Sequence, residues 1–288
     1  VTYLNVSRYL GSYFWGTSMY IYDLTGIEDF VSLDTLYCSL HEISSLDVSS
    51  CTSLEYLNCG NNQITSLDVS SCLSLQNLNC GVNQLTNLDL SSNTSLEIIY
   101  CNHNQLTSLD ISSNTLLKEF YCYSNQLTSL DVSSNILLER FSCNYNQITS
   151  LDFSSCTLLE YLQCSLNQLT SIDVTSCTLL ETLECNMNQL PSLDVSSCTS
   201  LIELRCDENQ LTSLDVGSCT LLNNLICNNN QLTSLDLSST SLTVLNCNNN
   251  SISTLDLSSI NLNADDIHAT NNQLNYVIMP DTLNHIKY

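Results

Sequence analysis

The chain has 288 residues, of which 43% are hydrophobic and 12% charged, and 29 acidic against 5 basic residues give it a formal net charge of -24. This excess of negative charge argues against nucleic acid and anionic lipid surfaces as partners, because like charges repel. No apolar run approaches the roughly 18 residues that a membrane-spanning helix needs, so direct insertion into a membrane is not expected.

Residues 1–32 precede a regular repeat and are predicted to form an N-terminal cap and entry coil. The segment is rich in aromatic residues, among them Tyr9, Tyr13, Phe14 and Trp15. Terminal coils of a repeat protein leave one side of the core open. We therefore expect these aromatic side chains to seal that open end.

Residues 33–262 repeat with a period of 21 residues, and the unit from Leu54 to Ser74 reads LEYLNCGNNQITSLDVSSCLS. Its first half fits the leucine-rich-repeat signature LxxLxCxxNxL. The signature asparagine recurs at Asn62, Asn83, Asn104, Asn125, Asn146, Asn167, Asn188, Asn209 and Asn230, continues with small shifts of phase to Asn250 and Asn272, and is replaced by His41 in the first clear repeat. The spacing predicts a leucine-rich-repeat solenoid of about twelve coils.

Each coil is predicted to contain one short strand, because Leu57 and Cys59 alternate with variable positions and side chains two residues apart share a face. Stacking the coils would pair these strands into a parallel sheet on the concave face. The second half of each unit, with Leu67, Val69 and position 72 pointing inward, is too short for a regular helix. We expect extended or turn-like segments on the convex face. Residues 263–288 are predicted to form a last irregular coil and C-terminal cap, closed by Ile278, Met279 and Pro280.

The 17 cysteines fall into two columns of the repeat. The first column is Cys38, Cys59, Cys80, Cys101, Cys122, Cys143, Cys164, Cys185, Cys206, Cys227 and Cys247, and the second is Cys51, Cys72, Cys156, Cys177, Cys198 and Cys219, shared with Asn93, Asn114 and Asn135. Free cysteine behaves as a small buried hydrophobic residue, which is the favoured interpretation. Disulfides are disfavoured by the in-register geometry and the odd total, and zinc by the lack of closely spaced ligand pairs. The asparagine column is expected to turn inward and satisfy backbone groups.

An aspartate column supplies 11 of the acidic residues: Asp47, Asp68, Asp89, Asp110, Asp131, Asp152, Asp173, Asp194, Asp215, Asp236 and Asp256. One interpretation is a calcium-binding ridge, because carboxylate oxygens suit this ion and stacked identical charges repel. The favoured alternative is that each carboxylate accepts hydrogen bonds from the following serines, as in an Asx-turn. No metal site and no cofactor are predicted.

The candidate ligand-binding residues are the variable positions that flank the inward residues of each strand, together with residues just after the strand. They are Tyr37, Tyr56, Ile98, Tyr100, His103, Tyr121, Tyr123, Arg140, Tyr145 and Tyr161. Tyrosine and arginine are enriched at the energetic centres of interfaces, and aromatic faces also stack on sugar rings. The competing interpretation is that tyrosine simply suits a half-buried strand surface.

No catalytic residues are predicted. The four histidines, at positions 41, 103, 268 and 285, lie in coils far apart, and no cysteine is placed beside one as an exposed nucleophile. Carboxylate pairs occur only as steps of the repeated aspartate column. These patterns argue against an enzyme.

The repeated LxxLxCxxNQLTSLDVS core and the entry segment DLTGIEDF at residues 23–30 resemble bacterial leucine-rich-repeat surface proteins of the internalin type, in the variant with 21-residue repeats and a cysteine ladder. Similar repeats are widespread in secreted proteins of Bacteroidetes-like bacteria. The resemblance covers roughly residues 19 to 288. It implies a secreted or cell-surface adhesin-like module, monomeric when isolated, that binds a protein or glycan through its concave face. The alternative is a structural accessory subunit docked on an outer-membrane or surface assembly.

Overall fold

The computed structural model describes residues 1–7, 20–258, 260 and 266–279. Short strands make up almost all of its regular structure, and its helical element η1 (Ile27–Asp29) is a single 3-10 turn. The strands are β1 (Tyr3–Asn5), β2 (Thr35–Tyr37), β3 (Tyr56–Asn58), β4 (Asn77–Asn79), β5 (Ile98–Tyr100), β6 (Glu119–Tyr121), β7 (Arg140–Ser142), β8 (Ser150–Asp152), β9 (Tyr161–Gln163), β10 (Ser171–Asp173), β11 (Thr182–Glu184), β12 (Glu203–Arg205), β13 (Asn224–Ile226), β14 (Val244–Asn246), β15 (Thr254–Asp256), β16 (Ile267–His268) and β17 (Tyr276–Ile278). Within the described ranges, no helix is long and apolar enough to cross a membrane.

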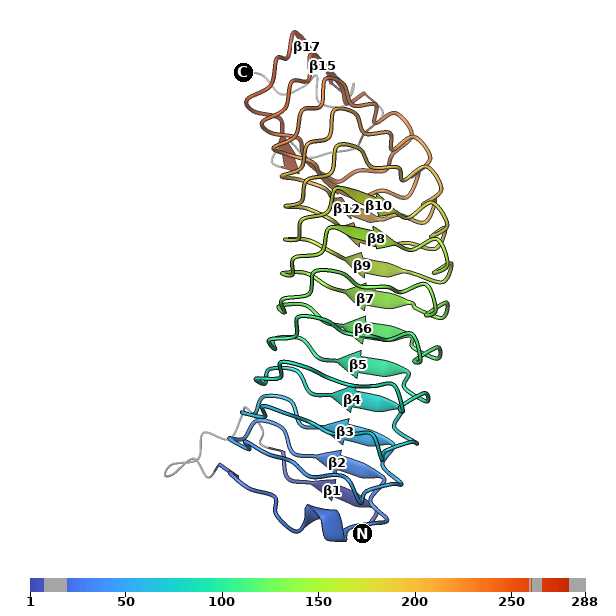
Figure 1. The fold of residues 1–288 in the computed structure, drawn as a ribbon. Coiled ribbons are helices and arrows are strands. Elements are labelled where there is room, and N and C mark those ends of the chain that lie inside the picture. The colour runs from blue at the N-terminus through green and yellow to red at the C-terminus, as the bar shows by residue number, and fades with distance from the viewer. Residues whose placement is uncertain (8–19, 259, 261–265, 280–288) are drawn as a thin grey trace. The chain divides into compact units, whose positions relative to one another are not determined.

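The coils form two compact units. The first comprises Val1–Leu138 with Tyr145–Gln147, and the second comprises Glu139–Asn144 with Ile148–Tyr288. In the first unit, β1 to β6 pair in chain order, parallel and in register (Figure 1). In the second unit the order is β7-β9-β11-β12-β13-β14-β16. The predicted leucine-rich-repeat solenoid with its parallel sheet is therefore confirmed.

The core of each coil is built from both halves of the repeat. In the coil that contains β3, Leu57 and Cys59 come from the strand side, and Leu67, Val69 and Cys72 come from the opposite side. All five are 8% exposed or less, as the repeat pattern predicts. The opposite side is extended in places: β8 pairs with β10, and β15 pairs with β17, both in parallel. The prediction of short extended or turn-like segments there is also confirmed.

The N-terminal strand β1 was not predicted from the sequence. It pairs in parallel with β2, with Tyr3 opposite Thr35, and so adds one step to the sheet before the repeat begins. The predicted seal of Tyr9, Tyr13, Phe14 and Trp15 lies outside the described residues.

At the other end, Ile278 and Met279 are 47% and 39% exposed, and Pro280 lies outside the described ranges. The closing role predicted for these three residues stays a prediction. The same holds for the division of the chain at residues 32/33 and 262/263.

The column of signature asparagines links each coil to its neighbours. Asn83 is typical: its Nδ2 donates to the carbonyl of Cys80 in its own coil at 3.0 Å and to that of Cys59 in the preceding coil at 3.1 Å. Its Oδ1 accepts from the Ile64 amide at 2.9 Å. These bonds satisfy backbone groups that the strand leaves unpaired, so the predicted structural role is confirmed.

His41 takes the place of this asparagine in the first repeat. Its Nδ1 accepts from the Ile21 amide at 3.4 Å, and its Nε2 lies 2.5 Å from the Val6 carbonyl oxygen. This pattern fits a hydrogen on Nε2 that points at the Val6 carbonyl. The side chain is 8% exposed and holds two N-terminal segments against the first coil.

All 17 cysteines are free and buried, which confirms their predicted packing role. In the second column, the Cys72 thiol donates to the Val48 carbonyl at 3.6 Å. Two coils on, Asn114 stands at the equivalent position and its Nδ2 donates to the Leu90 carbonyl at 3.2 Å. An amide and a thiol thus occupy the same place and contact the same kind of carbonyl group, which is why both residue types appear in one column.

One residue in each coil has left-handed backbone geometry, and it directly precedes the signature asparagine or His41. Among the described residues these positions are Leu40, Asn61, Val82, His103, Ser124, Tyr145, Leu166, Met187, Glu208, Asn229, Asn249 and Asn271, with φ between 52° and 65°. None is glycine, although glycine adopts this conformation most readily. Asparagine tolerates it better than most residues, whereas a β-branched side chain is strained there.

Replacing Val82 by asparagine is therefore expected to stabilise the protein. Val82 has φ 55° and is 40% exposed, so the change relieves backbone strain and loses little packing. The expected gain in the free energy of unfolding is about 1 kcal/mol, measured by denaturant titration. The matched control is Asn61→Val, at φ 56°, which should destabilise by a similar amount. Equal stability of all three proteins would show that these positions are not strained.

Candidate functional site

The strand face, defined here as the surface made by the first and third side chains of the sheet strands, carries seven of the ten residues predicted to bind a ligand. The other three, His103, Tyr123 and Tyr145, follow the strands of their coils. In the first unit a run of tyrosines begins on the strand face. Tyr3 and Tyr37 have ring centroids 6.0 Å apart, and Tyr37 and Tyr56 have centroids 6.2 Å apart. These three residues are called the tyrosine run. Tyr3 was missed by sequence reasoning because β1 lies outside the 21-residue period, and only its register with β2 places it here.

A second aromatic feature on the same unit is the tyrosine stack, formed by Tyr100 and Tyr121. Their rings are parallel within 1°, with centroids 4.7 Å apart. Both hydroxyls donate to Oε2 of Glu119, at 3.2 Å from Tyr100 and 3.4 Å from Tyr121. Stacking of this kind contributes about 0.5–1.5 kcal/mol beyond the burial of area. The carboxylate and the stacking together fix the orientation of both rings.

Between the tyrosine run and the tyrosine stack lies a depression of about 180 Å³, called here the tyrosine–asparagine pocket. Strands β2 to β5 line it with Tyr37, Tyr56, Leu57, Asn58, Asn77, Leu78, Asn79, Ile98 and Tyr100. Four of the predicted ligand-binding residues, Tyr37, Tyr56, Ile98 and Tyr100, are therefore brought together around one concavity. The asparagines in its lining, Asn58, Asn77 and Asn79, were not among the predicted ligand-binding residues, which were chosen mainly for aromatic and cationic character.

The remaining predicted residues of the first unit lie beyond the pocket. His103 packs edge-on against Tyr123, with centroids 5.1 Å apart and an interplanar angle of 83°. Tyr145 is 58% exposed. His103 and Tyr145 occupy the left-handed positions of their coils, with φ 52° and 56°.

In the second unit, the Arg140 guanidinium lies 5.8 Å from the centroid of the Tyr161 ring, a cation–π arrangement. Burial raises the pKa of the Tyr161 hydroxyl. On the same unit, Arg205 was not singled out from the sequence, and its Nε contacts Oε1 of Glu203 at 2.8 Å. The second unit thus offers a cationic and aromatic contact of its own.

The aspartate column forms Asx-turns, as the favoured interpretation predicts. The Asp47 Oδ1 accepts from the Ser49 amide at 2.9 Å, and the same bond recurs along the column. The hydrogen bonds from Ser49 lower the pKa of Asp47, and they outweigh the repulsion from Asp68 that acts in the other direction. The local hydrogen bonds therefore account for the recurrence of aspartate at this position. Among the described residues, no group of three or more potential metal ligands is found.

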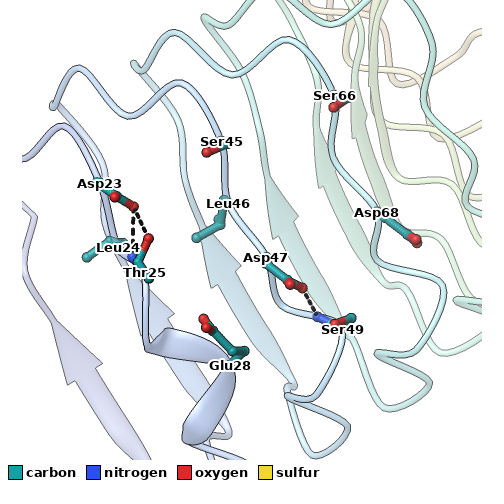
Figure 2. Close-up of a pocket in the computed structure, with 10 residues that line it drawn as sticks. All are labelled: Asp23, Leu24, Thr25, Glu28, Ser45, Leu46, Asp47, Ser49, Ser66 and Asp68. Carbon is teal, nitrogen blue, oxygen red and sulfur yellow. Dashed lines mark hydrogen bonds between the residues drawn. The ribbon is translucent and has the colours of Figure 1, made fainter.

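An acidic depression of about 370 Å³ lies at the N-terminal end of this column (Figure 2). Its carboxylates are already engaged locally: Asp23 accepts from the Thr25 amide at 2.8 Å, and Glu28 accepts from the Gly26 amide at 2.9 Å. Figure 2 shows Asp23, Asp47 and Asp68 coming from successive coils. These hydrogen bonds indicate that the carboxylates stabilise the turns of their own coils.

The cysteines lack the features of reactive nucleophiles. Burial raises the pKa of the Cys38 thiol to about 12 and that of the Cys72 thiol to about 11. Reactive cysteines instead have lowered pKa values and solvent access. Of the histidines, His41 is used in packing, His103 contacts Tyr123, His268 lies in β16, and His285 falls outside the described residues.

A family model described as leucine-rich repeats in two copies matches residues 31–72. No curated protein matches the chain. Among solved structures, the functional domain of InlJ from Listeria monocytogenes, which includes a cysteine ladder, is 33% identical with a TM-score of 0.78. The match covers 95% of this chain and 64% of the InlJ chain.

Two further structures share the fold at lower identity. The internalin InlF from Listeria monocytogenes is 23% identical, with a TM-score of 0.65 and coverage of 87% of this chain and 88% of that chain. The plant peptide hormone receptor RGFR1, solved in complex with RGF2, is 18% identical, with a TM-score of 0.73 and coverage of 85% and 48%.

Proposed function

Because the chain is a leucine-rich-repeat solenoid with a cysteine ladder like that of InlJ, we propose that it is a secreted or cell-surface recognition module of a bacterium. It binds a protein or glycan ligand through its strand face and carries out no catalysis. The single observation that supports this proposal most strongly is the gathering of ordered aromatic side chains on the strand face of the first unit.

The different roles of the columns within each coil support ligand binding at the strand face. The leucine, cysteine and asparagine columns are buried and used for packing, and the aspartate column forms turns. The outward strand positions are free of these constraints, and repeat proteins commonly bind partners through such surfaces. In the first unit the proposed principal contacts are Tyr100 and Tyr121 on the strand face and Tyr123 just after β6. In the second unit they are Arg140 and Tyr161 on the strand face.

RGFR1, a plant peptide hormone receptor that shares this fold, was solved in complex with RGF2, which is compatible with a recognition role for the present chain. The net charge of -24 favours neutral or basic ligands over anionic ones. An acidic surface also disfavours nucleic acid.

Replacing Tyr100 and Tyr121 together by alanine is expected to weaken ligand binding by at least about tenfold, because truncated aromatic contacts at an interface centre commonly cost more than 1.4 kcal/mol. The probes are printed arrays of extracellular proteins and of glycans, followed by titration of the strongest hit. The matched control is Thr107→Ala with Thr128→Ala, which changes exposed residues in the same two coils. Unchanged affinity of the tyrosine variant, with its melting temperature preserved, would refute this site.

A further inference from the structure

We infer that the tyrosine–asparagine pocket binds one neutral pyranose unit of a glycan. This inference rests on the proposed function, because it assigns a ligand class to part of the same strand face. It is carried by three features of the described residues: aromatic walls, an amide floor, and a lining without charge.

The walls offer aromatic surface on two sides. Tyr37 and Tyr56 lie at one end of the pocket, and Tyr100 lies at the other beside Ile98. Tyr56 is 40% exposed, so its ring is accessible. The face of an aromatic ring is electronegative, and the C–H groups of a pyranose present a weakly positive, apolar face. Such a ring therefore stacks on a tyrosine while its hydroxyls point elsewhere.

The floor offers amide groups held by the backbone. The Asn58 Oδ1 accepts from the Gly60 amide at 3.2 Å, and the Asn79 Oδ1 accepts from the Gly81 amide at 3.1 Å. These bonds use the Oδ1 atom of each asparagine. Within the described part of the chain, the Nδ2 atoms of Asn58 and Asn79 make no hydrogen bond and can therefore donate to a ligand. Asn77 likewise has no side-chain hydrogen bond to a described residue. Hydroxyl groups both donate and accept, so a sugar can satisfy these amides.

Glycine makes this floor possible. A Cβ at Gly60 would lie 2.8 Å from the Asn79 Oδ1, closer than real contacts allow, so the asparagine side chain can lie over the backbone only because residue 60 is glycine. Gly81 bears the same relation to Asn102, also at 2.8 Å. In the next coils the equivalent positions are Asn102, Tyr123 and Asn144. The two glycines therefore belong to the coils that form the pocket.

Charge narrows the ligand class. The lining contains only tyrosine, asparagine, leucine and isoleucine, and the chain as a whole carries a net charge of -24. The lining contains no cationic side chain that could pair with a carboxylate, phosphate or sulfate group. Acidic sugars are therefore disfavoured by long-range repulsion without local compensation. A hexose, deoxyhexose or N-acetylhexosamine fits this environment.

The test is titration of the full chain with neutral and acidic oligosaccharides, followed by ligand-observed NMR and calorimetry. We expect saturable binding of a neutral sugar, weakened at least about tenfold by Tyr56→Ala and by Asn77→Ala. Tyr56→Phe should retain most of the affinity because it keeps the ring. Tyr276→Ala, which removes a tyrosine 72% exposed outside the pocket, is the matched control and should bind as wild type.

Gly60→Ala provides a second, independent probe. The added methyl group must displace the Asn79 side chain, so affinity for the sugar should fall while the melting temperature reports any loss of folding. Sugar binding that is equal in wild type, Tyr56→Ala and Gly60→Ala would overturn the pocket assignment.

The inference and the proposed function fail in different ways. Absence of sugar binding, together with a protein ligand lost in the Tyr100→Ala, Tyr121→Ala variant, would overturn the sugar inference and leave the proposed function standing. Preference for an acidic sugar would also overturn it. Absence of any ligand on both protein and glycan arrays would overturn both.

Discussion

Replacing Asn125 by alanine is expected to lower the free energy of unfolding by about 3–5 kcal/mol, because it leaves several buried backbone groups without partners at once. The Asn125 Nδ2 donates to the carbonyls of Cys101 at 3.1 Å and Cys122 at 2.9 Å. Its Oδ1 accepts from the Leu106 amide at 3.0 Å. The side chain is 9% exposed, so water cannot easily replace these bonds. Denaturant titration of the full chain measures the change.

The control for this experiment is Gln126→Ala in the same coil. Gln126 is exposed, and its substitution should change the free energy of unfolding by less than about 0.5 kcal/mol. A loss below about 1 kcal/mol for Asn125→Ala would contradict the view that the asparagine column holds neighbouring coils together.

Native protein is expected to show less than one reactive thiol, whereas the unfolded chain should show all 17. Two effects act together: every cysteine is buried, and burial raises the thiol pKa, for example to about 12 for Cys185 and about 11 for Cys247. The thiolate is the reacting species, and for a thiol with a pKa near 11 roughly one in a thousand is ionised at pH 8. A colorimetric thiol reagent, added before and after denaturation without reductant, measures both numbers.

A Thr107→Cys variant supplies the matched control, because its side chain lies at an exposed position of the same solenoid. One thiol should then react rapidly in the native state. Fewer than 17 thiols in the unfolded wild type would reveal disulfides, and rapid native reaction of several wild-type thiols would contradict the assignment of both cysteine columns to the core.

Much of the fold could be predicted because the same 21 positions recur with the same physical demands. A buried position such as Leu57 and a turn position such as Asp68 each recur every 21 residues. Their places in the repeat are enough to separate buried positions from exposed ones. The strand β1 could not be predicted, since Tyr3–Asn5 follow no repeat and pair with β2 only through the fold. The left-handed positions were equally hidden, because residues as different as Val82 and Glu208 occupy them.

The sequence predicted that the tyrosines of the candidate site face outward, but it did not predict the depression that they line. Alternation within β3 and β5 places Tyr56 and Tyr100 outside, yet the depression between them depends on the asparagines of β4, whose side chains are shorter than those of the tyrosines. The space that Gly60 leaves for the Asn79 side chain of the next coil depends on two coils, and a single repeat does not reveal it. For the aspartate column, the sequence left two interpretations open, and the hydrogen bonds to the following residues identify the Asx-turn.

The central claim is that the strand face recognises the ligand while the columns of the repeat only build the solenoid. The most direct test compares three proteins on the same protein and glycan arrays, with calcium and with a chelator: wild type, Tyr100→Ala with Tyr121→Ala, and Asp110→Asn with Asp131→Asn. Asparagine can still form the Asx-turn, so the last variant removes column charge and keeps the fold. We predict that the tyrosine variant loses the wild-type hits and that the aspartate variant keeps them, with or without calcium. Loss of the hits in the aspartate variant or in chelator, with full retention in the tyrosine variant, would contradict the claim.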